Sequence, residues 1–143
     1  MGLFSIFKRD EGIDPDMTLL RDLIVIGASD SDYSLTENEH IVSICHKLGI
    51  PAKKLKKVFS MDPDRIKDVY PNTPQGREEY VIQLIDVMAA DAVCKTREIQ
   101  MLYHIADKMH YTHQQVDDLV RAYCKQVGGK RGERILDSFL ENR

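Results

Sequence analysis

Apolar residues recur at the spacing of an α-helix along almost the whole chain. Apolar positions at i, i+3 and i+4 are typical of an amphipathic helix with one face turned to a core. In the first half the pattern predicts three helices: one running to about Ser29, one ended by Gly49, and one begun by Pro51. Their expected inward residues are Leu19, Leu20, Leu23, Ile24 and Gly27, then Ile41, Ile44, Cys45 and Leu48, then Leu55, Val58 and Phe59.

The helical pattern breaks between roughly Ser60 and Gln75, a stretch that contains three prolines. Proline cannot donate a backbone hydrogen bond and interrupts a helix beyond its first turn. We therefore expect a linker over residues 61–73, with at most one helical turn, begun by Asp62-Pro63.

The pattern then returns and predicts three further helices and a short last one, from Arg134 to Leu140. Thr73 and Thr112 are the expected N-caps, and Gly128-Gly129 is the expected stop before the last helix. The expected inward residues are Val81, Leu84, Ile85 and Met88, then Ile99, Leu102, Ile105, Ala106 and Met109, then Val116, Leu119, Val120, Tyr123, Cys124 and Val127, and finally Ile135, Leu136, Phe139 and Leu140. No stretch shows the period-two alternation of a half-buried strand, so the predicted fold class is all-α.

The two halves of the chain resemble each other. An offset of 61 residues superposes apolar positions of one half on those of the other. The pairs are Leu20 with Val81, Leu23 with Leu84, Ile24 with Ile85, Ile41 with Leu102, Ile44 with Ile105, Leu48 with Met109, Ile50 with Tyr111, and Leu55 with Val116. The sequence therefore predicts a single-domain bundle of about seven to eight helices, built from two pseudo-repeated three-helix units.

The predicted domain covers residues 17–127, with repeat one at about 17–60 and repeat two at about 74–127. Residues 1–16 are expected to form a separate N-terminal segment, either mobile or packed on itself. The C-terminal helix, within residues 130–143, is expected to close the core or to pair with its copy in a second chain.

Composition narrows the classes of function. The 143 residues include 20 Lys and Arg against 23 Asp and Glu, a formal charge of −3, with no Trp and only 7% aromatic residues. Nucleic-acid binders usually carry a basic excess on one face, and single-strand binders an aromatic platform, so we expect no nucleic-acid partner.

The cysteines and the N-terminus point to the cytoplasm. Cys45, Cys94 and Cys124 form no C-x-x-C pair, and we expect them to be reduced, buried side chains. The apolar stretch from Leu3 to Phe7 is too short for a signal peptide or a membrane span, so we expect no membrane contact.

Acidic residues concentrate at two elbows between helices. In each elbow an Asp is followed seven residues later by a Glu in the first turn of the next helix, as in Asp32 with Glu39 and Asp91 with Glu98. One interpretation is structural: Thr36 and Glu39 form a capping box, and Glu98 favours the positive end of its helix.

The second interpretation is functional, and the two do not exclude each other. Five carboxylates would surround a hard divalent cation of the Ca²⁺ or Mg²⁺ class, which prefers oxygen ligands. These residues are Asp30, Asp32, Glu39, Asp91 and Glu98.

These elbows resemble those of the TerB family, the tellurite-resistance-associated all-helical domain. The family pattern runs Asp, Gly, any residue, an aliphatic, Ser or Thr, two more residues, then Glu. The stretch Asp32–Glu39 matches it at Asp, Leu, Thr and Glu but has Tyr33 for the Gly, and Asp91–Glu98 keeps the Asp and Glu but has Ala92 for the Gly and Lys95 for the Ser or Thr. The resemblance implies a cytoplasmic, stress-response-related helical domain with an acidic, metal-binding surface.

One basic cluster stands apart from the elbows, made of Lys53, Lys54, Lys56 and Lys57. The simplest interpretation is the solvated face of an amphipathic helix, because Leu55 alternates with the lysines. The alternative is a docking patch for an acidic partner or an anionic headgroup.

No motif in the sequence indicates an enzyme. The stretch from Asp30 fails as an EF-hand, because Leu35 stands where the loop needs Gly, and Glu37-x-x-His40 is a single copy of a motif that di-iron bundles need twice. The leading hypothesis is a non-enzymatic, TerB-like module that acts through contact with a protein partner and is modulated by a divalent cation at the elbows. The alternative is an interaction or scaffold domain without metal, and a carboxylate-bridged metalloenzyme is the third class.

Overall fold

A computed structural model describes residues 14–28 and 35–143, and for residues 35–37 the backbone only. Within these residues the chain is all-helical and contains no strand, which confirms the predicted fold class. The helices are α2 (Pro15–Gly27), α3 (Leu35–Leu48), α4 (Ala52–Ser60), the 3₁₀ turn η2 (Pro63–Arg65), α5 (Pro74–Met88), α6 (Thr96–Lys108), α7 (His113–Val127) and α8 (Gly129–Asn142).

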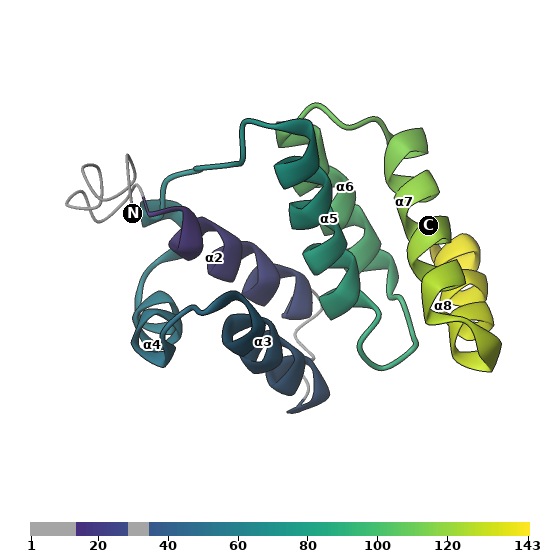
Figure 1. Cartoon of the computed structure of the whole chain (residues 1–143), viewed down its shortest axis with the longest axis horizontal. Coiled ribbons are helices and arrows are strands. Elements are labelled where there is room, and N and C mark those ends of the chain that lie inside the picture. Colours follow the sequence, from purple (N-terminus) through teal and green to yellow (C-terminus); the bar gives the residue numbers. More distant parts are fainter. Residues whose placement is uncertain (1–13, 29–34) are drawn as a thin grey trace.

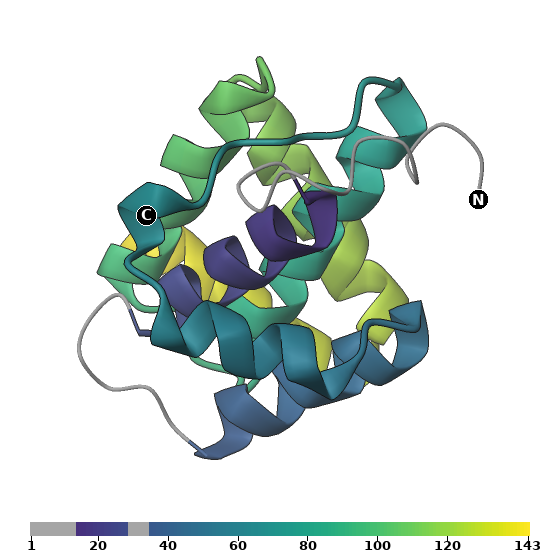
Figure 2. The same ribbon diagram turned by 90° about the vertical axis from the view of Figure 1, so that its left-hand side faces the viewer.

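Helices α2 and α5 pack against each other at the centre of the bundle (Figure 1). Helix α2 also contacts α3, α4 and α6, whereas α5 also contacts α3, α6 and α7. Helices α3 and α4 lie together under α2 (Figure 2), and α7 and α8 form a helical hairpin at the opposite end of the molecule. One hydrophobic core runs through both halves.

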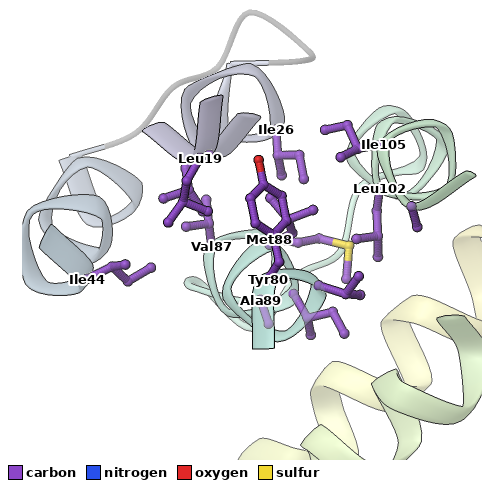
Figure 3. Packing of buried hydrophobic residues seen from close by; sticks show 14 of the residues in the cluster. Leu19, Ile26, Ile44, Tyr80, Val87, Met88, Ala89, Leu102 and Ile105 are labelled. Carbon is purple, nitrogen blue, oxygen red and sulfur yellow. The ribbon is translucent and has the colours of Figure 1, made fainter. Parts of the chain in front are cut away.

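The predicted inward stripes form this core (Figure 3). All of the residues predicted to be buried on α5 and α6 are buried in the structure, including Leu84, Ile85 and Leu102, which are fully inaccessible. The three cysteines are buried and free, as predicted. Because each stripe follows the 3.6-residue helical period, it stays on one face of its helix, where the neighbouring helices can cover it.

Three predicted core residues are instead exposed. Leu48, Phe59 and Val127 are 46, 51 and 38% exposed, so their assignment to the core was wrong. Each lies in the last turn of its helix, where a periodic pattern continues although the neighbouring helices no longer cover it.

The predicted helix boundaries follow local capping chemistry. Thr73 Oγ1 accepts the N–H of Gly76 at 3.0 Å, and Thr112 Oγ1 accepts the N–H of Gln115 at 3.1 Å, so both predicted N-caps are confirmed. Asp62 Oδ1 caps η2, the single turn expected in the linker. Helix α2 starts two residues before the predicted domain boundary, because Asp14 caps it ahead of Pro15.

The last helix is longer than predicted and approaches α7 closely. It runs from Gly129 rather than from Arg134, directly after Gly128, which has a positive φ of 73°. A Cβ atom on Gly132 would lie 2.3 Å from the carbonyl oxygen of Cys124 on α7. Only glycine therefore allows the two backbones to approach this closely.

Candidate functional site

The first acidic elbow falls largely outside the described residues. Asp30 and Asp32 lie in that part of the chain, and Glu39 is an exposed residue of α3. Helix α3 begins at Leu35, so Thr36 lies inside its first turn rather than at the N-cap position that the capping-box interpretation requires.

The second elbow is organised by its own carboxylates. Asp91 is exposed, and its Oδ1 accepts the N–H of Val93 at 3.1 Å. Glu98 is only 1% exposed, and its Oε1 accepts the N–H of Lys95 at 3.0 Å, which caps the start of α6. Ala92 has a positive φ of 64° at the position where a TerB elbow usually has glycine. Both carboxylates therefore shape the backbone of this elbow.

Helix α8 binds the backbone of the same elbow. The Arg131 guanidinium donates to the carbonyl oxygens of Ala89 and Ala90 at 3.3 and 3.2 Å. Ser138 Oγ accepts the N–H of Cys94 at 2.8 Å, and Asn142 donates to the Cys94 carbonyl oxygen at 2.8 Å. Three side chains of α8 thus bind backbone groups of this elbow and join it to the last helix.

In the described part of the chain, no three His, Cys, Asp or Glu side chains lie close enough together to hold a metal ion. The predicted set of five carboxylates is not tested by this finding, because it includes Asp30 and Asp32. The divalent-cation site remains a prediction.

The four lysines of α4 divide into two groups. Lys54 is half-buried, and its Nζ lies 2.9 Å from Asp14 Oδ2 and 2.8 Å from Asp16 Oδ2, so it fastens α4 to the first turn of α2. Lys53, Lys56 and Lys57 are exposed. We call these three residues the lysine face of α4.

Sequence reasoning missed a buried polar network on α2. Arg21 and Asp22 are 8 and 2% exposed, and the Arg21 guanidinium donates to Asp22 Oδ1, to the Ile66 carbonyl oxygen and to Asp68 Oδ1. Thr18 Oγ1 donates to the Lys67 carbonyl oxygen at 2.7 Å. The linker is therefore fastened along α2, and we call residues 61–73 the strap; Figure 1 shows it passing the start of α2 on its way to α5.

Two tyrosines complete this network. The hydroxyl of Tyr70 on the strap and that of Tyr80 on α5 both donate to Asp22 Oδ2, at 3.0 and 2.6 Å. The two rings meet edge to face with their centroids 5.3 Å apart. Asp22 thus joins α2, α5 and the strap.

The charges of the network hold one another in place. Burial opposes the charge of Arg21, but the carboxylates of Asp22 and Asp68 outweigh that effect and raise its pKa. Partial burial acts to raise the pKa of Asp68, but its hydrogen bond to Arg21 prevails and lowers it. Burial and the negative charge of Asp22 raise the pKa values of Tyr70 and Tyr80. Arg21 is therefore held charged, and both phenols are held protonated.

The sequence carried a signal for this network. Helix α2 is apolar nearly all round, with Leu19 and Leu20 before the charged pair Arg21-Asp22 and four apolar residues after it. A helix that is hydrophobic all round is buried on every side, so charged residues in its middle must find partners inside the fold.

No helix in the described ranges combines the length and the apolar character needed to cross a membrane. No family model, curated protein or solved structure matches this chain.

Proposed function

We propose that this chain is a non-enzymatic helical interaction module that docks an acidic segment of a protein partner on the lysine face of α4. The observation that carries the proposal is a difference in burial and pairing among the lysines of α4. Lys54 forms the ion pairs that position the helix, whereas Lys53, Lys56 and Lys57 have exposed side chains.

The lysine face is compact. Positions i, i+3 and i+4 of a helix lie on one side, so Lys53, Lys56 and Lys57 present their ammonium groups together. Among the described residues no carboxylate pairs with Lys53 or Lys56. Phe59, three residues after Lys56, is 51% exposed and lies beside the charges. A positive patch attracts and orients a partner segment of opposite charge.

We propose that this docking does not require a metal ion. At the second elbow, Asp91 and Glu98 hold the backbone N–H groups of Val93 and Lys95, and Arg131 binds the carbonyl oxygens of Ala89 and Ala90. These contacts support the structural interpretation of the acidic residues at this elbow. The TerB-like, stress-related, cation-modulated form of the hypothesis is the alternative, and its predicted ligands are Asp30, Asp32, Glu39, Asp91 and Glu98.

We also propose that the bundle is two pseudo-repeated units that arose by duplication, and that the protein acts in the cytoplasm. Buried pairs at the offset of 61 residues support the duplication: Leu20 with Val81 and Ile44 with Ile105 are all at most 2% exposed. The reduced, buried cysteines support the location.

The test of the docking surface is charge reversal. A synthetic glutamate-rich peptide with one central Phe should bind the wild-type protein at low ionic strength and weaken as salt rises. Lys53→Glu/Lys56→Glu should weaken binding about tenfold or more, since two attractive pairs become repulsive. The matched control, Lys125→Glu/Lys130→Glu, reverses two exposed lysines on α7 and α8 and should change affinity less than about twofold.

Two outcomes would overturn the proposal: no binding of the peptide by the wild type, or equal weakening by both pairs of substitutions. Binding to phosphatidylserine vesicles without binding to the peptide would assign the lysine face to a membrane instead. Calorimetric titration of chelator-treated protein with Ca²⁺ and Mg²⁺ tests the metal separately. Heat of binding that disappears in Asp32→Asn would favour the cation-modulated alternative.

A further inference from the structure

A cavity of about 460 Å³ opens between α2, the strap and α6. Its volume falls in the range of pockets that hold small molecules. Helix α6 contributes one face, with Met101, His104, Ile105 and Lys108 at positions i, i+3, i+4 and i+7. No residue of the cavity lining belongs to the lysine face or to the second acidic elbow, so the role of the cavity does not depend on the proposed function.

One part of the cavity wall is apolar. Val25 of α2, Ile66 of the strap, and Met101 and Ile105 of α6 line it. Ile66 and Ile105 are 3 and 1% exposed, so the accessible surface of this wall belongs mainly to the half-buried Val25 and Met101. A hydrocarbon group resting on this wall would leave water at no cost in hydrogen bonds.

Another part of the lining is basic. Lys67, His104 and Lys108 are exposed residues that line the cavity. The Lys108 ammonium lies 3.4 Å from Asp68 Oδ2, a longer contact than the 2.6 Å between Asp68 Oδ1 and Arg21. Within the described residues Lys67 has no carboxylate partner.

The acidic residues of the cavity are mostly committed elsewhere. Asp22 accepts hydrogen bonds from Arg21, Tyr70 and Tyr80, and Asp68 is held by Arg21. Asp64 is the remaining carboxylate of the lining. Because Arg21 occupies Asp22 and Oδ1 of Asp68, the lining carboxylate oxygens left for Lys67, His104 and Lys108 are those of Asp64 and Oδ2 of Asp68.

We propose that this cavity binds a small organic anion, with a carboxylate held by Lys67, His104 and Lys108 and a hydrocarbon body against the apolar wall. The ligand would bridge α2, the strap and α6, which belong to different parts of the chain. Binding would therefore stabilise the fold as a whole by mass action.

The first experiment compares two probes of equal shape and opposite charge. Hexanoate should bind with a Kd of about 1 mM, shift the backbone amide NMR signals of residues 64–68 and 101–108, and raise the melting temperature. Hexylammonium at the same ionic strength should do neither. An absence of hexanoate-dependent shifts at about 10 mM, or equal shifts with hexylammonium, would overturn the proposal.

Paired variants then locate the anion. Lys108→Gln should weaken hexanoate binding about fivefold, as should Lys67→Gln, because each removes one partly exposed charge. Asp68→Asn should strengthen binding by a similar factor, because it removes the carboxylate that competes for Lys108. The control Lys130→Gln changes an exposed lysine on α8 and should leave the affinity unchanged.

Asp68→Asn removes a partner of Arg21, and this variant could fail to fold for that reason. The lysine variants test the position of the anion without it. Equal hexanoate affinity in Lys108→Gln, Lys67→Gln and Lys130→Gln would place the anion elsewhere and overturn the assignment.

Discussion

The hydroxyl of Tyr80 on α5 donates a 2.6 Å hydrogen bond to Oδ2 of Asp22 on α2, and the two residues are only 6 and 2% exposed. The bond joins the two central helices of the bundle inside its core. It also completes the shell of donors around a buried carboxylate, which would be costly to leave unsatisfied.

Removing this hydroxyl should therefore destabilise the protein out of proportion to its size. Tyr80→Phe should lower the free energy of unfolding by about 1–3 kcal/mol, because a charged acceptor loses its shortest bond. Urea denaturation measures the loss. The control is Tyr111→Phe, a half-buried tyrosine at the turn between α6 and α7 with no hydroxyl hydrogen bond in the described residues. Equal losses in the two variants would contradict the role assigned to Asp22.

Gly132→Ala should separate α7 from α8. Alanine normally stabilises a helix interior by about 1 kcal/mol relative to glycine. Here the added Cβ would lie 2.3 Å from the Cys124 carbonyl oxygen, so the backbones must move and the protein should lose about 1–3 kcal/mol. Thermal unfolding reports the sign. The neighbouring exposed position provides the control, since Glu133→Ala should change stability by less than about 0.5 kcal/mol. A stabilised Gly132→Ala protein would show that the close approach is not as tight as described.

The protein should lose stability in alkali. Burial, aided by the charge of Glu98, raises the pKa of Cys94 from 9.0 to about 12, and burial with the hydrogen bond to Asp117 raises that of Tyr103 from 10.0 to about 12. The folded state keeps both protons longer than the unfolded chain does. Their contribution is therefore complete below about pH 9 and is lost as the pH rises towards 12.

Urea unfolding between about pH 8 and pH 11 tests this expectation, with the free energy of unfolding declining above about pH 9. Cys94→Ala should show a shallower decline than the wild type, because the thiol no longer titrates. Glu133→Ala, which removes a surface carboxylate that stays ionised throughout this range, should keep the wild-type slope. The same slope in Cys94→Ala as in the wild type would remove Cys94 from the explanation.

The sequence was sufficient for the helices and most of their buried faces. Leu84, Leu102 and Val116 each belong to a row of apolar residues at helical spacing, and local capping by Thr73 and Thr112 set two of the helix starts. The apolar periodicity was insufficient where the burial of a residue depends on the position of other helices. Phe59 fits its stripe as well as Val58 does, but Val58 is 5% exposed and Phe59 is 51% exposed.

The candidate sites were harder to predict because they depend on contacts between distant parts of the chain. Nothing local indicates that Lys54 pairs with Asp14 and Asp16 while Lys53 extends into solvent. Likewise, the contact of Arg131 with the carbonyl oxygens of Ala89 and Ala90 joins residues about forty positions apart and could not be read from periodicity.

The strap is part of the packed contact between the two halves of the chain. It is rich in proline and polar residues, like a flexible connection, but Thr18, Arg21 and Asp22 hold it against α2 so that it forms an outer wall of the core. Lengthening it, or opening the chain between Ile66 and Tyr70, would strip the partners from a buried charge. The strap thus both connects the two halves and stabilises the contact between them. A split version of this protein should therefore be cut outside the strap.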